Sequence, residues 1–215
     1  MKKNKLIVFD IDGTLTESVE IHQKGFINAL TQLGVRKIDS NFKAYKHHTD
    51  SFIAKEIYEN DKNTSFSETE VRKFEVLLLN FIQNYQISEV KGAKRTVEQI
   101  ENDTDFGICY ATGSLLKPAK HKLDSIGLKY NCEQLIASNN IEDRENIVLK
   151  AIQSAKSFYN AEKFERIISV GDGLWDLQTA KNLNLEFIGI GPKNKEIMIE
   201  NGMKNYFEDL TNFKI

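Results

Sequence analysis

Two carboxylates follow the first apolar run of the chain and are well placed to do chemistry. Residues 6–9 read as a buried strand, and Asp10, Asp12 and Gly13 come directly after it. The glycine predicts that the chain turns here, so both acids lie at the carboxyl end of a strand, where open α/β sheets bind ligands. Two close carboxylates repel each other unless a cation or a shared proton compensates. The pair therefore predicts a metal or acid–base site, and the alternative is an Asp-Gly turn with solvated acids.

A hydroxyl and two small residues follow a second apolar run. Thr112, Gly113 and Ser114 come after residues 106–111, at a predicted strand end before a helix. Backbone amides and a hydroxyl in that position are suited to hold a phosphate oxygen. The alternative is that Thr-Gly-Ser is ordinary loop sequence.

A second acidic pair and one arginine add to these candidates. Asp172 follows the apolar residues 166–170, and Asp176 comes four residues later. A helical turn between them would bring both acids toward one point. Read by itself, Asp172 is equally typical of a helix N-cap. Arg144 lies in a charged run before a predicted helix, where the alternative is a surface charge cluster.

Together these residues point to phosphate chemistry. They supply four carboxylates, a hydroxyl with free amides and one fixed cation, each at a predicted strand end or helix start. Oxygen ligands in that number suit Mg²⁺. A metal ion, backbone amides and a guanidinium together suit a phosphate group.

The elements that must position these groups alternate between strand and helix. Short apolar runs predict buried parallel strands, and segments with helical apolar spacing separate them. We therefore expect an α/β fold with a doubly wound parallel sheet. The predicted strands are residues 6–11, 106–111, 134–137, 166–170 and 186–190.

Residues 18–85 interrupt this alternation with helix after helix. Apolar residues recur there at helical spacing, and Ser67 with Glu70 has the sequence of a capping box. We expect a small all-α cap domain inserted after the first strand, beside the strand ends, where it acts as a lid. The alternative is a set of extra helices packed on a face of the sheet.

The composition is that of an ordinary globular domain. The chain has 215 residues, of which 28% are charged, a formal net charge of -2, and two cysteines. We find no basic footprint for nucleic acid, no apolar run long enough to span a membrane, and no disulfide framework or metal-ligand spacing of cysteines. We therefore expect a cytoplasmic protein with no nucleic-acid partner and no membrane partner.

The motifs resemble those of the haloacid dehalogenase superfamily of phosphohydrolases. Residues 10–14, Asp-Ile-Asp-Gly-Thr, are similar to its first motif, and Thr112 matches the second. Arg144 matches the basic third motif, and Asp172 with Asp176 matches the acidic fourth. The resemblance covers nearly the whole chain and points to the phosphatase branch, which includes phosphoglycolate phosphatase and β-phosphoglucomutase.

The resemblance implies a domain organisation. Residues 1–17 and 86–215 would form a Rossmann-like core domain, and residues 18–85 would form a helical cap of the C1 type. The chain departs from the family in one place: the commonest capped phosphatases carry a Lys-Pro pair in the third motif, and this chain has Arg144 followed by glutamate.

Carried over residue by residue, the family's mechanism implies a role for each acid. Asp10 is the nucleophile that forms an aspartyl-phosphate, and Asp12 is the acid toward the leaving group and the base toward water. Mg²⁺ is held by the side chains of Asp10 and Asp172 and the backbone carbonyl of Asp12, with Asp176 orienting a bound water or Asp172. Relatives that displace halide lack the second acid, so Asp12 favours phosphoryl transfer over dehalogenation.

The resemblance also implies which groups hold the phosphate. Thr112 and Gly113 take phosphoryl oxygens, and Arg144 fixes the nucleophile and stabilises charge in the transition state. Because arginine and lysine are not interchangeable, Lys117 and Lys150 remain alternatives for the third motif.

Two polar residues of the cap are candidates for substrate contact. His22 resembles a position that faces the active site in capped relatives, and the alternative is partial burial on the helix stripe. Thr49 either contacts the substrate or caps the helix that follows it.

We expect a Mg²⁺-dependent phosphatase that acts on a small phosphorylated metabolite as a monomer or homodimer. One alternative is a phosphomutase of the same family, which passes the phosphoryl group to a sugar. Another is a non-catalytic regulatory module, against which the presence of both Asp10 and Asp12 argues.

Overall fold

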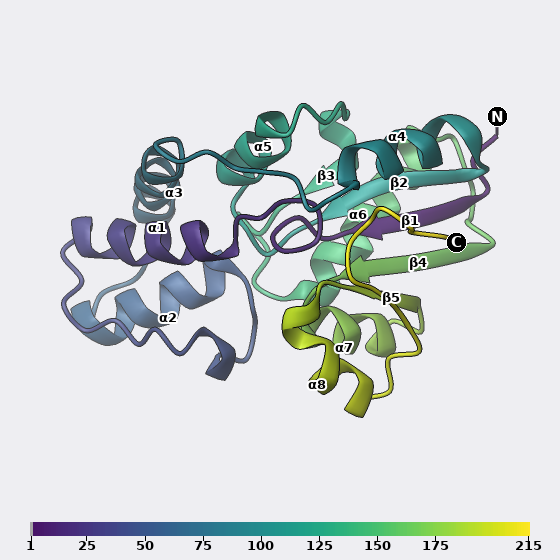
Figure 1. Ribbon diagram of the computed structural model, residues 1–215. Coiled ribbons are helices and arrows are strands. Elements are labelled where there is room, and N and C mark those ends of the chain that lie inside the picture. Colours follow the sequence, from purple (N-terminus) through teal and green to yellow (C-terminus); the bar gives the residue numbers. More distant parts are fainter. Residues whose placement is uncertain (1) are drawn as a thin grey trace.

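The chain folds around a six-stranded parallel sheet with the strand order β3-β2-β1-β4-β5-β6. The computed structural model describes residues 2–215 and is shown in Figure 1. The predicted α/β class with a doubly wound parallel sheet is confirmed. The strands are β1 (Lys5–Phe9), β2 (Phe106–Ala111), β3 (Leu135–Ile136), β4 (Arg166–Gly171), β5 (Glu186–Ile190) and β6 (Asn205–Phe207).

Helices cover both faces of the sheet because its central strands are apolar on both sides. Along β1, Ile7 and Phe9 pack into one hydrophobic cluster, whereas Leu6 and Val8 pack into a second one on the opposite face. Strands that are apolar at every position are typical of parallel sheets buried on both faces. The first cluster includes residues of α4 (Ala93–Asp103) and α5 (Leu116–Ser125), and the second includes residues of α6 (Arg144–Phe158). Beside β5, α7 (Leu174–Asn182) and α8 (Lys195–Glu200) pack together.

The predicted strands match the interior of the sheet and miss one edge. The residues of β2 and β5 are those predicted, but β3 is only two residues long. The opposite edge strand, β6, was not predicted, because its three residues are only partly buried and form no apolar run. An edge strand has one neighbour and less of the apolar pattern that identifies a buried strand.

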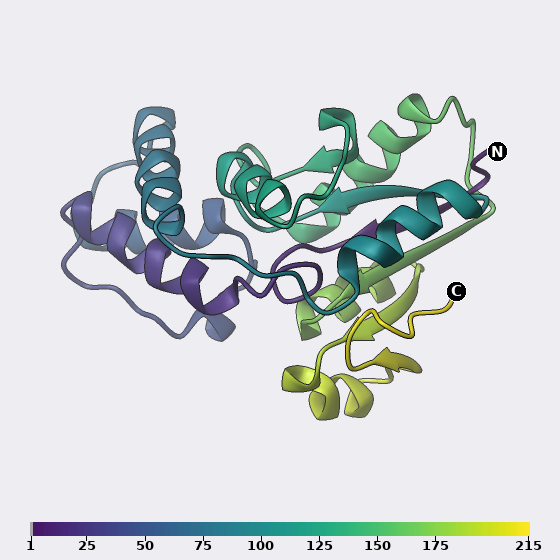
Figure 2. The same ribbon diagram turned by 45° about the horizontal axis from the view of Figure 1, so that its top comes forward.

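Three helices form a separate group beyond the carboxyl ends of the strands (Figures 1 and 2). They are α1 (Val19–Gln32), α2 (Asp50–Lys62) and α3 (Glu68–Ile82), and a short 3-10 helix, η1 (Phe42–Ala44), lies between α1 and α2. Two further 3-10 helices, η2 (Cys132–Gln134) and η3 (Pro192–Asn194), belong to the part of the chain that contains the sheet. The helices α1, α2 and α3 share a hydrophobic cluster that includes no residue of a strand. They therefore pack on one another, and on α5, rather than on a face of the sheet.

Two connecting segments join this helical group to the sheet, and they lie side by side. The backbone N–H of Glu17 donates to the carbonyl of Ser88 at 2.9 Å, and that of Val90 donates to the carbonyl of Leu15 at 2.9 Å. Thr16 also forms an antiparallel bridge with Glu89. The two connections are thus tied together as one short ribbon.

The capping box predicted at Ser67 does not form. Ser67 is the N-cap of α3, but its side chain makes no hydrogen bond to the helix backbone. Its hydroxyl donates instead to the Glu70 carboxylate. The start of the helix is therefore as predicted, but its side-chain pairing is not.

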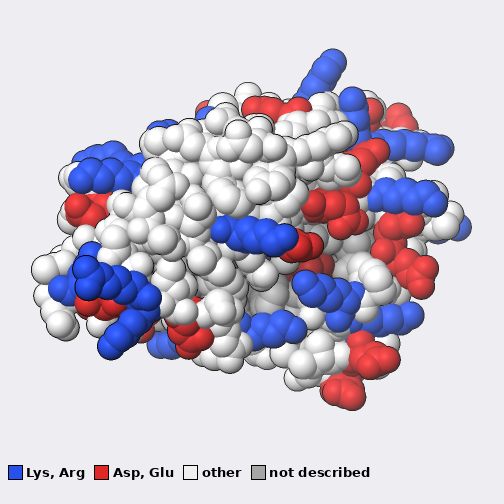
Figure 3. Space-filling view, turned by 60° about the vertical axis from the view of Figure 1, so that its left-hand side comes forward, with Lys and Arg blue, Asp and Glu red and all other residues white. Residues whose placement is uncertain are grey.

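The surface carries mixed charge. On the face in Figure 3, basic and acidic side chains are interspersed, and a broad area carries neither. Within residues 2–215, no helix is both long enough and apolar enough to cross a membrane. Both cysteines are free, Cys109 in the interior and Cys132 on the surface.

Phe74 tests whether the helical group depends on its own core. Its side chain is 0% exposed and packs against Phe26 and Phe66, with ring centroids at 5.0 and 6.1 Å. Phe74→Ala should lower the free energy of unfolding by about 3–5 kcal/mol, because it removes a large buried ring and leaves a cavity. Urea unfolding would measure the loss. Val76→Ala, at a position on the same helix that is 40% exposed, is the matched control, and an equal loss in both variants would contradict the prediction.

Candidate active site

Three strand ends bring predicted polar residues together. Asp10 follows β1, Thr112 follows β2 and Asp172 follows β4. Because β2 and β4 flank β1 in the sheet, the three residues lie at the same edge, and all three are buried. The parallel topology thus produces the cluster, at the place where such sheets bind ligands.

The turn after β1 depends on Gly13. This residue has a φ of 79°, in the left-handed region that favours glycine. A Cβ at this position would overlap the Asp172 carboxylate. Glycine therefore permits both the turn and the close approach of Asp172 to the loop that carries Asp10 and Asp12.

Arg144 is the basic residue that contacts Asp10. It is the first residue of α6, whose N-cap Asp143 accepts a hydrogen bond from the Asn146 backbone N–H at 2.8 Å. One guanidinium nitrogen, Nη2, lies 3.0 Å from Asp10 Oδ1 and also donates to the Asp176 carboxylate. Arg144 is therefore a buried residue of the site and not part of a surface charge cluster, which was the alternative interpretation of the sequence.

The two alternative lysines lie elsewhere. Lys150 is exposed on α6. The Lys117 side chain is 52% exposed and lies 3.7 Å from Glu75. Of the three basic residues considered for the third motif, Arg144 is the one in the site.

Asp10 and Asp172 carry incompletely compensated negative charge. Burial raises the pKa of Asp10 to about 7; Arg144 opposes this rise, and the charges of Asp176 and Asp12 add to it. Burial, together with the charges of Asp176 and Asp10, raises the pKa of Asp172 well above its usual range. Within residues 2–215, no cation forms an ion pair with Asp172. These acids need a further positive charge to stay ionised.

A divalent cation fits this acidic cluster. Asp10, Asp172 and Asp176 offer oxygen atoms that all lie within 4.8 Å of one another. Asp176 already accepts hydrogen bonds from Arg144 and from the backbone N–H of Gly173, the latter at 3.0 Å. Asp10 and Asp172 are therefore the side chains best placed to hold the ion, with Asp176 beside them. Buried carboxylate oxygens of this kind suit a hard cation.

The reading of Asp172 as a helix N-cap is wrong. The N-cap of α7 is Gly173, and the helix begins at Leu174. The carboxylate of Asp176, three residues after the cap, satisfies the free backbone N–H of Gly173. The Asp172 side chain thus remains available to the acidic cluster.

Asp12 has different partners from Asp10. Its carboxylate oxygens lie 2.6 and 2.7 Å from the Lys122 ammonium, and Ser18 donates a hydrogen bond to it. Burial would raise the pKa of Asp12, but the charges of Lys122 and His22 and the hydrogen bonds of Lys122 and Ser18 outweigh it and lower the pKa to about 2. With its side chain committed to Lys122, Asp12 has its backbone carbonyl left for a metal, as the family resemblance implies.

Lys122 is a residue that motif reading missed. It lies on α5 with an exposed fraction of 0%. The signal in the sequence is its spacing, because it falls on the apolar stripe between Ala119 and Leu123. A lysine on the buried side of a helix requires a buried partner.

His22 and Asp50 extend the same network into the helical group. The Lys122 ammonium lies 2.8 Å from His22 Nδ1, and His22 Nε2 lies 2.8 Å from Asp50 Oδ1. His22 comes from α1 and Asp50 from the first turn of α2. Two alternatives were considered for His22, partial burial on the helix and a position facing the active site. The structure shows both, because His22 is half-buried on α1 and faces the site.

The loop after β2 presents donors toward the site. The Thr112 hydroxyl accepts a hydrogen bond from the Ser114 backbone N–H at 3.1 Å. Within residues 2–215, the backbone N–H of Gly113 donates no hydrogen bond. A Cβ on Gly113 would collide with the His48 carbonyl and crowd Arg144. Glycine therefore leaves a free donor where the helical group comes close to the sheet.

Thr49 caps the helix that follows it, α2. It is the N-cap of α2, where its hydroxyl accepts from the Phe52 N–H at 3.3 Å and donates to the Glu142 carbonyl at 2.6 Å. These bonds favour the capping role over contact with a substrate, although Thr49 also lines the pocket described next.

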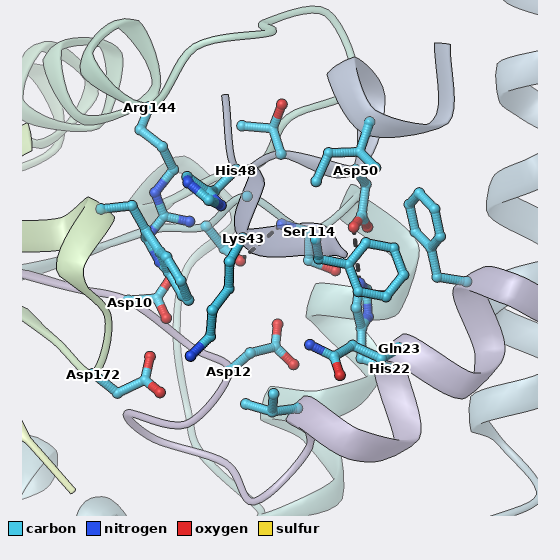
Figure 4. A pocket seen from close by; sticks show the side chains of 18 of the residues that line it. Asp10, Asp12, His22, Gln23, Lys43, His48, Asp50, Ser114, Arg144 and Asp172 are labelled. Carbon is cyan, nitrogen blue, oxygen red and sulfur yellow. Dashed lines mark hydrogen bonds and ion pairs between the residues drawn. The ribbon is translucent and has the colours of Figure 1, made fainter. Parts of the chain in front are cut away.

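A pocket of about 150 Å³ lies between the helical group and the strand ends (Figure 4). Asp10, Asp12, Arg144 and Asp172 line its polar end. Lys43 extends into it from η1. Further residues along its wall are Val19, Gln23, Phe26, Phe42, His48, Ile53, Trp175, Lys193 and Asn194. His48 stacks on Trp175, with ring centroids 4.7 Å apart, and so joins the two sides of the pocket.

Solved structures with the same fold include three whose similarity extends over nearly the whole chain. CbbY from Rhodobacter sphaeroides in complex with phosphate superposes with a TM-score of 0.73 and 16% identity, over 99% of this chain and 96% of that chain. A putative beta-phosphoglucomutase from Bacteroides vulgatus gives a TM-score of 0.70 and 12% identity, over 99% and 86%. A predicted phosphoglycolate phosphatase from Haemophilus somnus gives 0.64 and 16%, over 99% and 97%. At these identities the likeness shows the fold.

Comparison of the sequence itself gives the family. No curated protein matches the chain. The sequence profile described as haloacid dehalogenase-like hydrolase matches residues 7–190, a span that runs from β1 through β5 and includes every acid of the cluster. The chain belongs to the haloacid dehalogenase-like hydrolase family.

Proposed function

We propose that this protein is a Mg²⁺-dependent phosphatase that hydrolyses a small phosphorylated metabolite through an aspartyl-phosphate on Asp10. The observation that carries the proposal is the division of the acidic pair between two cations: Arg144 contacts Asp10 and Lys122 contacts Asp12. Two neighbouring carboxylates with different environments can take different chemical roles. The family and the phosphoryl-transfer relatives of the same fold support this reading.

The first chemical step uses Asp10. A carboxylate oxygen of Asp10 attacks phosphorus opposite the leaving oxygen, so that a P–O bond to Asp10 forms as the ester P–O bond breaks. The electron pair of the broken bond goes to the leaving oxygen, which takes a proton from Asp12. Because the pKa of Asp12 is low in the substrate-free site, Asp12 must gain this proton as the anionic substrate binds beside it. In the second step Asp12 removes a proton from water, whose oxygen attacks phosphorus and releases Asp10 and inorganic phosphate.

Other residues hold the transferred group during these steps. The free N–H of Gly113 and the hydroxyl of Thr112 are at the right strand end to take phosphoryl oxygens. Arg144 orients Asp10 through its 3.0 Å contact and adds positive charge beside the reacting oxygens. Asp10 and Asp172 would hold Mg²⁺, whose charge would offset the repulsion between Asp10 and an anionic substrate.

We propose further that residues 18–85 act as a cap over a core of residues 1–17 and 86–215. The separate hydrophobic cluster of α1, α2 and α3 supports this division. The pocket lies between the two parts, and its volume of about 150 Å³ suits a small ester. Because Phe26, Phe42 and Ile53 line the cap side, specificity for the leaving group would come mainly from this helical group.

Substitution of Asp10 tests the reaction. With 4-nitrophenyl phosphate and Mg²⁺, the wild type should release phosphate, and Asp10→Asn should lower kcat on the order of 10³-fold or more, because an amide is not a competent nucleophile. Asp103→Asn, at an exposed position at the end of α4, is the matched control. An inactive wild type across a broad panel of phosphate esters would refute the proposal. Conversion of a hexose phosphate into its isomer without net phosphate release would identify a phosphomutase instead.

The raised pKa of Asp10 predicts how metal binding depends on pH. A carboxyl group whose pKa is raised on folding stabilises the metal-free protein at low pH, and this stabilisation is lost as the pH rises through about 7. Mg²⁺ binds the ionised form, so its stabilising effect should grow over the same range. Thermal unfolding should show a larger Mg²⁺-induced rise in Tm at about pH 8 than at about pH 5.5, and Asp10→Asn should reduce this difference. An equal rise at both pH values would contradict the assignment of Asp10 to the metal.

A further inference from the structure

Lys122 is a fully buried charged group to which the family's motifs assign no role. Its side chain is 0% exposed, and its neighbours on the buried side of α5 are Ala119 and Leu123. Removing an ammonium group from water costs several kcal/mol unless partners satisfy its charge and its hydrogen atoms. The partners of Lys122 therefore indicate what it does.

All three ammonium donors of Lys122 have a polar partner. The Lys122 ammonium contacts the two carboxylate oxygens of Asp12 at 2.6 and 2.7 Å, and it also donates to His22 Nδ1 at 2.8 Å and to Ser114 Oγ at 3.2 Å. An ammonium group has three hydrogen atoms and no acceptor. These bonds therefore fix the direction of the lysine head group, and with it the place of the Asp12 carboxylate.

The acceptor role of His22 Nδ1 determines the rest of the network. Since this nitrogen accepts from Lys122, Nε2 carries the ring proton and donates it to Asp50 Oδ1 at 2.8 Å. The other oxygen of Asp50 accepts from the backbone N–H of Leu115 at 3.0 Å, and its own N–H donates to the Gly113 carbonyl at 2.7 Å. Each end of the network is thus anchored to the loop after β2.

We propose that Lys122 is a positioning residue that orients the Asp12 carboxylate toward the leaving oxygen. Through His22 and Asp50, this orientation depends on the packing of α1 and α2 against α5. The inference rests on the proposed phosphatase function. Lys122 contacts both oxygens of the Asp12 carboxylate and Ser18 donates to Oδ1, while the side chain keeps 19% of its surface exposed and lines the pocket. When α1 and α2 move away from α5, Lys122 loses His22 and Asp12 loses its fixed place. Proton transfer to the leaving group is then confined to the state in which the cap is seated over the substrate.

The proposal predicts a loss that depends on the leaving group. A good leaving group such as 4-nitrophenolate departs without a proton, whereas an alkoxide needs one. Lys122→Met should therefore lower kcat on the order of 10²-fold or more for an alkyl phosphate, but less than about tenfold for 4-nitrophenyl phosphate. A series of substituted phenyl phosphates would show kcat depending more steeply on leaving-group basicity than in the wild type. Lys120→Met, on the same helix, is the matched control and should leave both rates unchanged.

Asp50→Asn is the second variant, and it keeps the proposal testable if Lys122→Met does not fold. The amide retains the shape of Asp50 but cannot accept both the His22 and the Leu115 hydrogen bonds with two oxygens. It should show the same dependence on leaving group with a smaller loss. An equal loss for all esters in the variant that folds, or no loss, would overturn the proposal. Failure of the proposed function is a different result, because the wild type itself would then hydrolyse no ester.

Discussion

The site is governed by a shortage of positive charge among buried acids. Asp10, Asp12, Asp172 and Asp176 are gathered at one edge of the sheet, and two buried cations, Arg144 and Lys122, face them. Four buried carboxylates against two buried cations leave an excess of negative charge that a divalent ion would offset, and Lys43, which extends into the same pocket, adds further positive charge. Burial and repulsion raise the pKa of Asp172, which has no ion-pair partner within residues 2–215, and of Asp10, which shares Arg144 with Asp176. The balance of buried charge thus supports the proposed metal ion, as does the arrangement of the oxygen atoms.

The distribution of these cations gives different pKa values to Asp10 and Asp12, which are nearly adjacent in sequence. Asp10 shares Arg144 with Asp176, whereas Asp12 has Lys122 to itself. The pKa values move in opposite directions as a result, to about 7 for Asp10 and about 2 for Asp12. The turn at Gly13 makes this possible, because it directs the Asp12 side chain toward α5 while Asp10 remains at the end of β1.

Much of this could be predicted from the sequence, because the signals are local. Apolar strands and helical stripes gave the α/β class and the helical insertion, and acids at strand ends gave the cluster. The interpretation of the sequence missed a residue whose role depends on contacts between segments that are far apart in the chain. Lys122 joins α5 to the loop after β1 and to α1, so no motif marks it, and only its place on an apolar stripe indicates burial. Asp172 was ambiguous for a local reason, because a difference of one residue in where α7 begins decides whether Asp172 or Gly173 is its N-cap.

The paired connections between the sheet and the helical group restrict how that group can move. Because the segments around Thr16 and Glu89 are bonded to each other, the chain enters and leaves the helical group through one ribbon. Ser18 and His22, which contact Asp12 and Lys122, follow this ribbon directly. The segment before α2 returns to the sheet at a second place, where Thr49 donates to the Glu142 carbonyl and the Asp50 N–H donates to the Gly113 carbonyl. Any displacement of the helical group that opened the pocket would therefore break this second attachment while the ribbon stayed intact.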